Sequence, residues 1–378
     1  MSSVTALPLG FVTTVLVVSA CTFVALRPPL PQHSRPFRLS FALGYLINEQ
    51  PLLGLVLLAP GVAATLTSAV GEPTWWLAVA LTAIPVAGLA ALAIRTRSAR
   101  PALESALART PGIGVPRTRP SALRVLLPAL FWHPGVRRLR NRRYGSHRSQ
   151  RLDVYVPRRG ASGAPVLLYL HGGGFQTGSK VLGGLPLLHR LAAHGWVCAS
   201  ASYRLRTRYA DSLDDARHAL AWLREHADEL GGDPARVVVA GGSAGAHLAT
   251  TIALTDPSVS AAIGFYGYYG PAGRPAPGAP ASPYGCLSPE APPTLLVHGT
   301  LDTLVPIGEA RRFADRLDAV ATAPVVLAEL PGTQHNFDFF HSLRSTAVVD
   351  AAHAFADWAV RRQPGSDRPA PRAVTARR

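Results

Sequence analysis

Three long runs without a charged residue dominate the hydrophobic pattern of the N-terminal part of the chain. They are residues 9–26, 52–70 and 75–94. Each is about 18–20 residues long, enough to cross a ~30 Å hydrocarbon layer as a helix. Trp75 and Trp76 open the third run, as is typical where a helix meets the membrane surface. The pattern therefore predicts a membrane anchor over residues 1–95, with the bilayer as a partner.

The connections between these runs differ in charge. The stretches after the first and third runs carry arginines, whereas the "GEPT" connection after the second carries no basic residue. These arginines are Arg27, Arg35 and Arg38, then Arg95, Arg97 and Arg100. Because positive loops stay in the cytoplasm, the N-terminus is expected outside and everything after Arg95 inside. The protein is thus expected in a bacterial-type cell membrane with its catalytic domain cytoplasmic.

Two features of the anchor leave alternatives open. "VSAC", ending at Cys21, resembles a lipoprotein cleavage site, although no basic residue precedes the apolar run. Cleavage there would place the catalytic domain outside the cytoplasm. Glu49 is expected at the membrane surface, with a functional carboxylate inside the membrane as the alternative.

A different pattern begins near Leu152. Short apolar runs such as "LDVYVP", "PVLLYLHG", "RVVVAGG" and "PTLLVHG" alternate with helical segments, of which Asp211–Leu230 is the longest. Continuous apolar strands that alternate with helices indicate a mostly parallel sheet covered on both faces. We therefore expect an α/β catalytic domain over residues 146–362.

The segment between these parts, residues 96–145, is interpreted as a linker followed by an amphipathic or lid segment. Four prolines mark residues 96–120 as the linker. The apolar Leu123–Trp132 and the basic Arg137–Arg143 then predict a helix, either on the membrane surface with its arginines toward anionic lipid or packed on the catalytic domain. Residues 363–378 lack apolar periodicity and are expected to be a disordered basic tail.

The amino-acid composition adds little to these predictions. The formal net charge is +16, but there is one lysine, Lys180, and no aromatic-interleaved basic ladder or nucleic-acid-binding motif. An arginine-rich and lysine-poor composition reflects a GC-rich genome rather than a nucleic-acid partner. The three cysteines lie far apart and suggest no disulfide framework.

The clearest chemical signal is "VVVAGGSAGAHLA". A buried strand, Val237–Ala240, leads into Gly241-Gly242-Ser243-Ala244-Gly245 and then into a helix. This is the G-x-S-x-G pattern in the strand-to-helix context of a nucleophile elbow. Small residues are needed there because the serine occupies a strained turn that neighbouring backbone passes closely. Ser243 is therefore the candidate nucleophile.

Three adjacent glycines follow His171 in "HGGGF". Glycines at the end of a buried strand expose backbone N–H groups that can stabilise an oxyanion. We expect Gly173 and Gly174 to supply two of these donors and Ala244 the third, with Gly172 as a possible substitute. His171 is expected to brace the loop rather than to take part in the reaction.

A serine needs a base, and the base needs an orienting carboxylate. In this type of fold the acid comes next in the chain and the histidine last. "LLVHGTLDTLVP" offers Asp302 and "AELPGTQHNF" offers His335, each at the end of a strand. The competing residues are Glu309, Asp338, His298, His341 and His353.

Together these motifs resemble the α/β-hydrolase superfamily, and most closely the hormone-sensitive-lipase-like carboxylesterases. The resemblance covers about residues 150–362 and includes "SYRL", in which Tyr203 is expected to support the glycine loop. It implies hydrolysis of carboxylic esters through Ser243, Asp302 and His335, with no cofactor and no metal. Two departures stand out: Gly242 replaces an acidic residue that is common in the family, and the segment between Tyr268 and Ser288 is short for a lid. Residues 101–145 are therefore expected to form part of the acyl-binding wall.

The resulting prediction is a membrane-anchored serine carboxylesterase or lipase acting on a small-molecule or lipid ester. A lipophilic substrate drawn from the bilayer is one interpretation of the anchor, and simple localisation is the other. An amidase or peptidase of the same fold is an alternative, as is a catalytically silent binding module.

Overall fold

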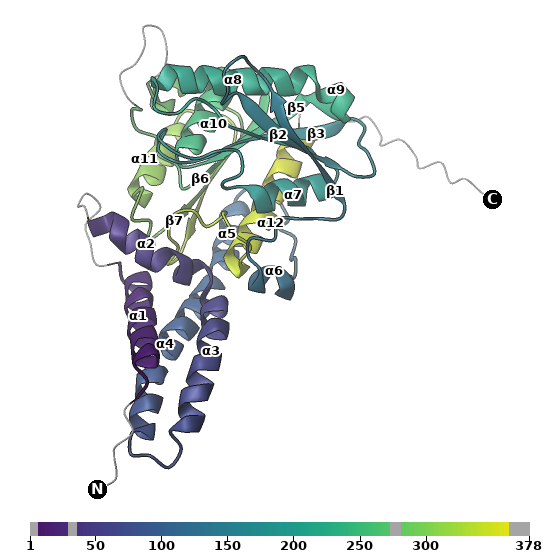
Figure 1. The fold of residues 1–378 in the computed structure, drawn as a ribbon. Coiled ribbons are helices and arrows are strands. Elements are labelled where there is room, and N and C mark those ends of the chain that lie inside the picture. The colour runs from purple at the N-terminus through teal and green to yellow at the C-terminus, as the bar shows by residue number, and fades with distance from the viewer. Residues whose placement is uncertain (1–6, 29–35, 273–280, 363–378) are drawn as a thin grey trace, which may run out of the picture.

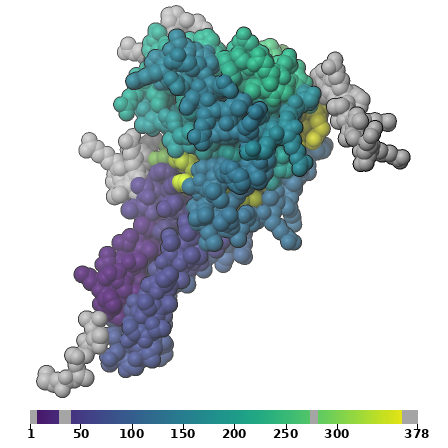
Figure 2. Space-filling model, turned by 45° about the vertical axis from the view of Figure 1, so that its right-hand side comes forward, coloured from purple at the N-terminus to yellow at the C-terminus, as the bar shows by residue number. Residues whose placement is uncertain are grey.

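The chain forms a helical stalk that projects from a larger α/β body (Figures 1 and 2). The computed structural model describes residues 7–28, 36–272 and 281–362, with the backbone alone for residues 36–39. The tail that was expected to be disordered, residues 363–378, lies outside the described residues.

The three apolar runs are helices and make up the stalk. They are α1 (Leu9–Leu26), α3 (Pro51–Ser68) and α4 (Trp75–Thr96). All three are long and apolar enough to cross a membrane. Large apolar side chains face outward along them, including Leu9, Leu57 and Ile94, which are 81%, 72% and 66% exposed. Such a surface indicates contact with a membrane or another apolar partner rather than with water.

The body is built on one eight-stranded sheet in the order β1-β2-β4-β3-β5-β6-β7-β8. β1 pairs with β2 and β2 with β4 in antiparallel fashion, and the other neighbours are parallel. The strands are β1 (Val136–Arg143), β2 (Arg151–Pro157), β3 (Ala164–Leu170), β4 (Val197–Ala201), β5 (Gly232–Gly242), β6 (Val259–Phe265), β7 (Thr294–Gly299) and β8 (Val325–Leu330). The predicted mostly parallel sheet is thus confirmed.

Helices cover both faces of this sheet (Figure 1). Val166 and Leu168 of β3 pack with α8 and α10, whereas Leu167 and Tyr169 point into the core shared with α5, α7 and α12. This alternation explains why the strands read as continuous apolar runs. The helices of the body are α5 (Ala99–Leu107), α6 (Ala122–Leu126), α7 (Leu185–Ala193), α8 (Tyr209–Glu225), α9 (Ala227–Leu230), α10 (Ala244–Thr255), α11 (Ile307–Asp318) and α12 (Leu343–Arg361), with the short 3-10 turn η1 (Pro283–Cys286).

The linker expected at residues 96–120 is partly helical. Residues 99–107 form α5, which continues almost directly from α4 and packs against α12 and β8. Ala99, Leu103 and Leu107 are fully buried and repeat every four residues, the spacing of one helix face. The prolines that suggested a linker lie at the edges of this helix and beyond it.

The helix expected over Leu123–Trp132 and Arg137–Arg143 is largely wrong. Only Ala122–Leu126 is helical, as α6, and the arginine-rich stretch is the edge strand β1. The buried carboxylate of Asp153 on β2 explains this: it accepts hydrogen bonds from the Arg138 guanidinium and, at 2.7 Å, from the backbone N–H of Asn141. Charged side chains are common on edge strands, where they discourage pairing with other chains.

Glu49, expected at the membrane surface, is buried. It ends α2 (Pro36–Glu49), a helix across the head of the stalk, and pairs with the fully buried Arg344 at the start of α12. Arg344 also donates to the backbone carbonyl of Asn48 at 3.2 Å. The helix α2, which lies at the head of the stalk (Figure 1), is therefore joined to the body through a buried ion pair.

Removing one member of this pair should be costly, because the other charge remains buried without compensation. We expect Arg344→Ala to lower the free energy of unfolding by about 3–5 kcal/mol. The matched control is Arg311→Ala, which breaks the exposed pair with Glu329 and should cost about 1 kcal/mol or less. Thermal unfolding in detergent micelles measures both, and equal losses for the two variants would contradict the structural role of the buried pair.

Candidate active site

Ser243 occupies the sharp turn between β5 and α10. Its φ and ψ are 54° and −118°, a conformation that a residue with a side chain rarely adopts. A Cβ atom on Gly245 would collide with the carbonyl group of Leu170, so the position two after the serine must be glycine. The turn leaves Ser243 half-buried at the carboxyl end of the central strand, where the elbow was predicted.

Asp302 and His335 are in direct contact. The Asp302 Oδ2 atom lies 2.7 Å from His335 Nδ1, and its Oδ1 atom accepts the backbone N–H groups of Leu304 and Val305, each at 2.9 Å. Burial opposes ionisation of Asp302, but His335 and His298 hold the pKa of its carboxyl below the ordinary value. A carboxylate at this position keeps the proton of His335 on Nδ1 and leaves Nε2 available as a base.

Ser243 and His335 both lie near Tyr266. The Tyr266 ring centroid lies 4.3 Å from that of His335, and the same side chain contacts Gly242, the residue before the serine. The Ser243 hydroxyl donates to no group within the described ranges. The contacts thus bring Asp302 and His335 together, with Ser243 beside the tyrosine that His335 packs on.

The competing acids have other partners. Asp338 is buried and accepts hydrogen bonds from Tyr169 at 2.6 Å, from the N–H of Gly184 at 2.8 Å and from Tyr266. Burial raises the pKa of its carboxyl. Glu309, expected on the helix after the acid loop, lies in the first turn of α11 and pairs with Arg312.

The competing histidines are also engaged elsewhere. His298 ends β7, with its Nε2 atom 2.9 Å from the Val305 carbonyl and 3.2 Å from Asp302. The His341 ring packs on Phe131, and His353 lies on α12 with its Nε2 atom 3.3 Å from Asp357. Among the described histidines, only His335 and His298 place a ring nitrogen within 4.0 Å of the Asp302 carboxylate.

The glycine loop packs directly on the elbow. A Cβ atom added to Gly172 would lie 3.1 Å from the Cβ of Ser243. Gly173 has a φ of 119°, and its carbonyl accepts the N–H groups of Gln176 and Thr177, each at 3.0 Å, which closes a tight turn. In the part of the chain that the structure describes, the N–H groups of Gly173, Gly174 and Ala244 donate no hydrogen bond. These donors are therefore available to a ligand beside Ser243.

His171 and Tyr203 support this loop from behind. Their rings stack with centroids 4.4 Å apart, and the Tyr203 hydroxyl donates to the His171 carbonyl at 2.7 Å. Burial lowers the pKa of His171 to about 4. A neutral His171 can donate from Nδ1 to the Gly172 carbonyl, 2.7 Å away.

One element beside His335, the helix α2, was not predicted from the sequence. Phe41 meets the His335 ring edge-on with centroids 6.4 Å apart, and the Tyr45 hydroxyl donates to the Asn336 carbonyl at 2.9 Å. Gln50, just after α2, donates to the His341 carbonyl at 2.8 Å. The four-residue spacing of Phe41, Tyr45 and Glu49 was the available signal for a buried helix face. Side chains of α2 therefore contact His335 and its loop, and the acyl-binding wall expected from residues 101–145 stays a prediction.

The named relatives and the solved structure that match this chain are ester hydrolases. A family model described as BD-FAE matches residues 152–267. A probable carboxylic ester hydrolase, LipM, of Mycobacterium tuberculosis is 33% identical and aligns over 92% of each chain. Esterase LipC of the same organism is 34% identical, over 56% of this chain and 63% of its own. Among solved structures, esterase 2 of Thermogutta terrifontis phosphonylated by cyclosarin matches with a TM-score of 0.52 and 28% identity, over 63% of this chain and 97% of its own.

Two buried histidines near the site should make the fold sensitive to acid. Burial lowers the pKa of His171 and of His247 to about 4, whereas an unfolded histidine titrates near 6.5. The unfolded chain therefore binds more protons between these values, and stability should fall as the pH drops from about 6.5 to 4. Urea unfolding across this range should show a shallower fall for His247→Gln. His218→Gln, at an exposed histidine of α8, should leave the dependence of stability on pH unchanged. The same dependence in the wild type and in both variants would show that burial of His247 does not cause the loss of stability in acid.

Proposed function

Because this chain belongs to the α/β-hydrolase family of carboxylic ester hydrolases, as its motifs predicted, we propose that it hydrolyses lipophilic esters at Ser243 while anchored in a membrane. The observation that supports this site is the strained turn at Ser243, which packs against the glycine loop. Among the described residues, the backbone N–H groups of Gly173, Gly174 and Ala244 donate no hydrogen bond. Acyl transfer needs both parts within reach of one carbonyl group.

The reaction proposed for this site has two steps. His335 Nε2 takes the proton of Ser243 as its oxygen attacks the ester carbonyl, and then returns that proton to the departing alcohol. The acyl group remains on Ser243 until water, activated by the same His335, hydrolyses it. Asp302 holds the tautomer of His335 and stabilises the imidazolium through their 2.7 Å contact.

The charge that develops on the carbonyl oxygen would be stabilised by the N–H groups of Gly173, Gly174 and Ala244. Gly172 is the substitute donor, because a Cβ atom on it would lie 3.1 Å from the Cβ of Ser243. Ala244 begins a twelve-residue helix, whose dipole also favours negative charge at this end. Loss of one such donor costs about 2.7–4 kcal/mol of transition-state stabilisation in comparable enzymes.

The anchor supports a substrate that comes from the bilayer. α2 carries Phe41 beside His335 and leads directly into α3, one of the three helices long enough to span a membrane. An acyl chain bound along Phe41 would thus point toward the stalk. We propose α2 as a wall of the acyl-binding site, in place of residues 101–145.

The domain division is also a proposal. Residues 1–95 would be the anchor and residues 146–362 the catalytic unit, with α5 of the intervening segment packed on that unit and β1 added to the edge of its sheet. The arginines after α1 and α4 favour a cytoplasmic catalytic unit. Cys21 lies inside α1, so lipoprotein processing there would remove most of that helix. This favours an uncleaved chain.

Ser243→Ala should abolish activity while leaving the fold intact. Loss of a catalytic nucleophile lowers turnover by about four to six orders of magnitude. The assay uses p-nitrophenyl esters and covalent labelling with a fluorophosphonate probe, a chemistry supported by the phosphonylated T. terrifontis esterase. Ser200→Ala, at a buried serine of β4, is the matched control and should retain labelling and activity. A mild loss in the Ser243 variant would exclude it as the nucleophile.

Phe41→Ala tests the acyl wall. Removing the ring should lower kcat/KM by about tenfold for a hexadecanoate ester and by less than about twofold for an acetate, because only a long chain would lie along α2. Leu43→Ala, at an exposed position of the same helix, is the matched control. The same decrease for every chain length, from two to sixteen carbons, would show that Phe41 only positions His335.

A further inference from the structure

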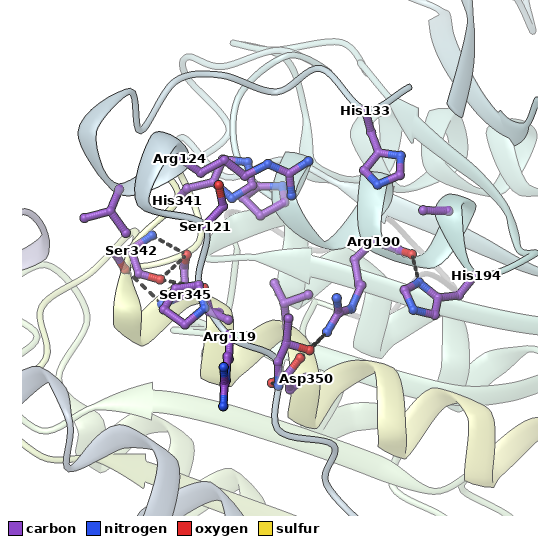
Figure 3. Close-up of a pocket in the computed structure, with 17 residues that line it drawn as sticks. Arg119, Ser121, Arg124, His133, Arg190, His194, His341, Ser342, Ser345 and Asp350 are labelled. Atoms are coloured by element: carbon purple, nitrogen blue, oxygen red, sulfur yellow. Dashed lines mark hydrogen bonds and ion pairs between the residues drawn. The ribbon is translucent and has the colours of Figure 1, made fainter. Parts of the chain in front are cut away.

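A cavity that Ser243 does not line lies in the body near its junction with the stalk. Its volume is about 120 Å³, and its walls come from the segment 118–133, from α7 and from the first half of α12. Three guanidinium groups and three imidazoles gather around it (Figure 3). They belong to Arg119, Arg124, Arg190, His133, His194 and His341.

The one carboxylate of this cavity is already occupied. Asp350 accepts hydrogen bonds from Arg190, from Arg100 at 2.5 Å and from the N–H of Thr118 at 3.0 Å. The single negative charge of Asp350 therefore neutralises the positive charges of Arg100 and Arg190 only in part. The cavity keeps an excess of positive charge.

Arg119 and Arg124 have no acidic partner among the residues that the structure describes. Arg124 makes a single long hydrogen bond, 3.5 Å, to the Trp132 carbonyl. Burial and the charge of Arg190 lower the pKa of Arg124, and both side chains line the same cavity, with the Arg190 guanidinium directed toward Asp350 (Figure 3). An anion between them would relieve this repulsion and would accept two-pronged hydrogen bonds.

The surroundings of the cavity are apolar and lie close to the stalk. Leu123, Leu126, Leu127 and Trp132 are between 44% and 63% exposed on and after α6. α6 also contacts α3, and Val125 lines both this cavity and a smaller one beside Pro51 and Leu52 at the start of α3. Figure 1 shows α6 at the level where the stalk meets the body. Exposed leucines and tryptophan next to arginines are typical of a surface in contact with lipid headgroups.

We propose that this cavity binds the phosphate group of an anionic phospholipid, held by Arg124 and Arg190, with the acyl chains along α6 and α3. The chemistry recognised is a phosphate anion, and the apolar surroundings favour a lipid as its source. The inference rests on the membrane placement proposed above and not on ester hydrolysis. Lipid binding and catalysis can therefore fail separately.

The test measures thermal unfolding of the full-length protein in neutral detergent, with phosphatidylglycerol, phosphatidylcholine or inorganic phosphate added. A ligand at about 100 times its Kd stabilises the folded state by about 2.7 kcal/mol, which is a shift of several degrees. We expect this shift with phosphatidylglycerol and none with phosphatidylcholine. Arg124→Gln should remove at least half of it. Arg97→Gln, at an exposed arginine at the end of α4 and outside the cavity, should keep it.

Each other outcome is decisive. A shift that Arg124→Gln and Arg119→Gln both retain, or no shift at all, overturns the proposal. An equal, Arg124-dependent shift with inorganic phosphate overturns the lipid source and assigns the cavity to a soluble phosphate compound. Unfolding temperatures without lipid must match among the variants. Fluorophosphonate labelling of the same samples reports separately on Ser243.

Discussion

The site depends on how one loop, residues 331–342, is held between β8 and α12. From the body, Asp302 binds His335 at 2.7 Å and Tyr266 packs on its ring. From the stalk, Tyr45 and Gln50 bind backbone carbonyls of the same loop, and Glu49 pairs with Arg344 immediately after it. His335, the proposed base, therefore lies between two structural units. Contacts from the α/β body and contacts from α2 and Gln50 together determine its position.

This arrangement explains why a buried ion pair lies at the junction. An apolar contact between α2 and α12 would tolerate sliding, whereas Glu49 and Arg344 accept only one register because each buried charge needs its partner. The desolvation of both groups makes the pair a poor source of stability and a good determinant of position. The same logic applies to Asp153, which fixes the edge strand β1 through the Arg138 guanidinium and the backbone N–H of Asn141.

The backbone structure predicted from short local patterns in the sequence was confirmed. The Ser243 turn, the glycine loop and the strands that precede Asp302 and His335 each carry a short pattern whose backbone requirements only a few residues meet. α2 and β1 could not be predicted in this way, because their partners are distant in the chain. Arg137–Arg143 has no apolar alternation and becomes a strand through Asp153 and the backbone of β2. The helix α5 was predictable from Ala99, Leu103 and Leu107, but the prolines around it dominated the interpretation.

The end of the body beside the stalk carries two different surfaces. On one side, α2 brings Phe41 and Tyr45 to the histidine loop. On another, Arg124 and Arg190 face a cavity beside the exposed leucines of α6. The loop 331–342 connects them, because His335 lies at the first surface and His341 at the second. An anion bound between Arg124 and Arg190 would thus contact the same loop that presents the base. Lipid binding at the cavity and catalysis would then be linked through the seven consecutive residues from His335 to His341.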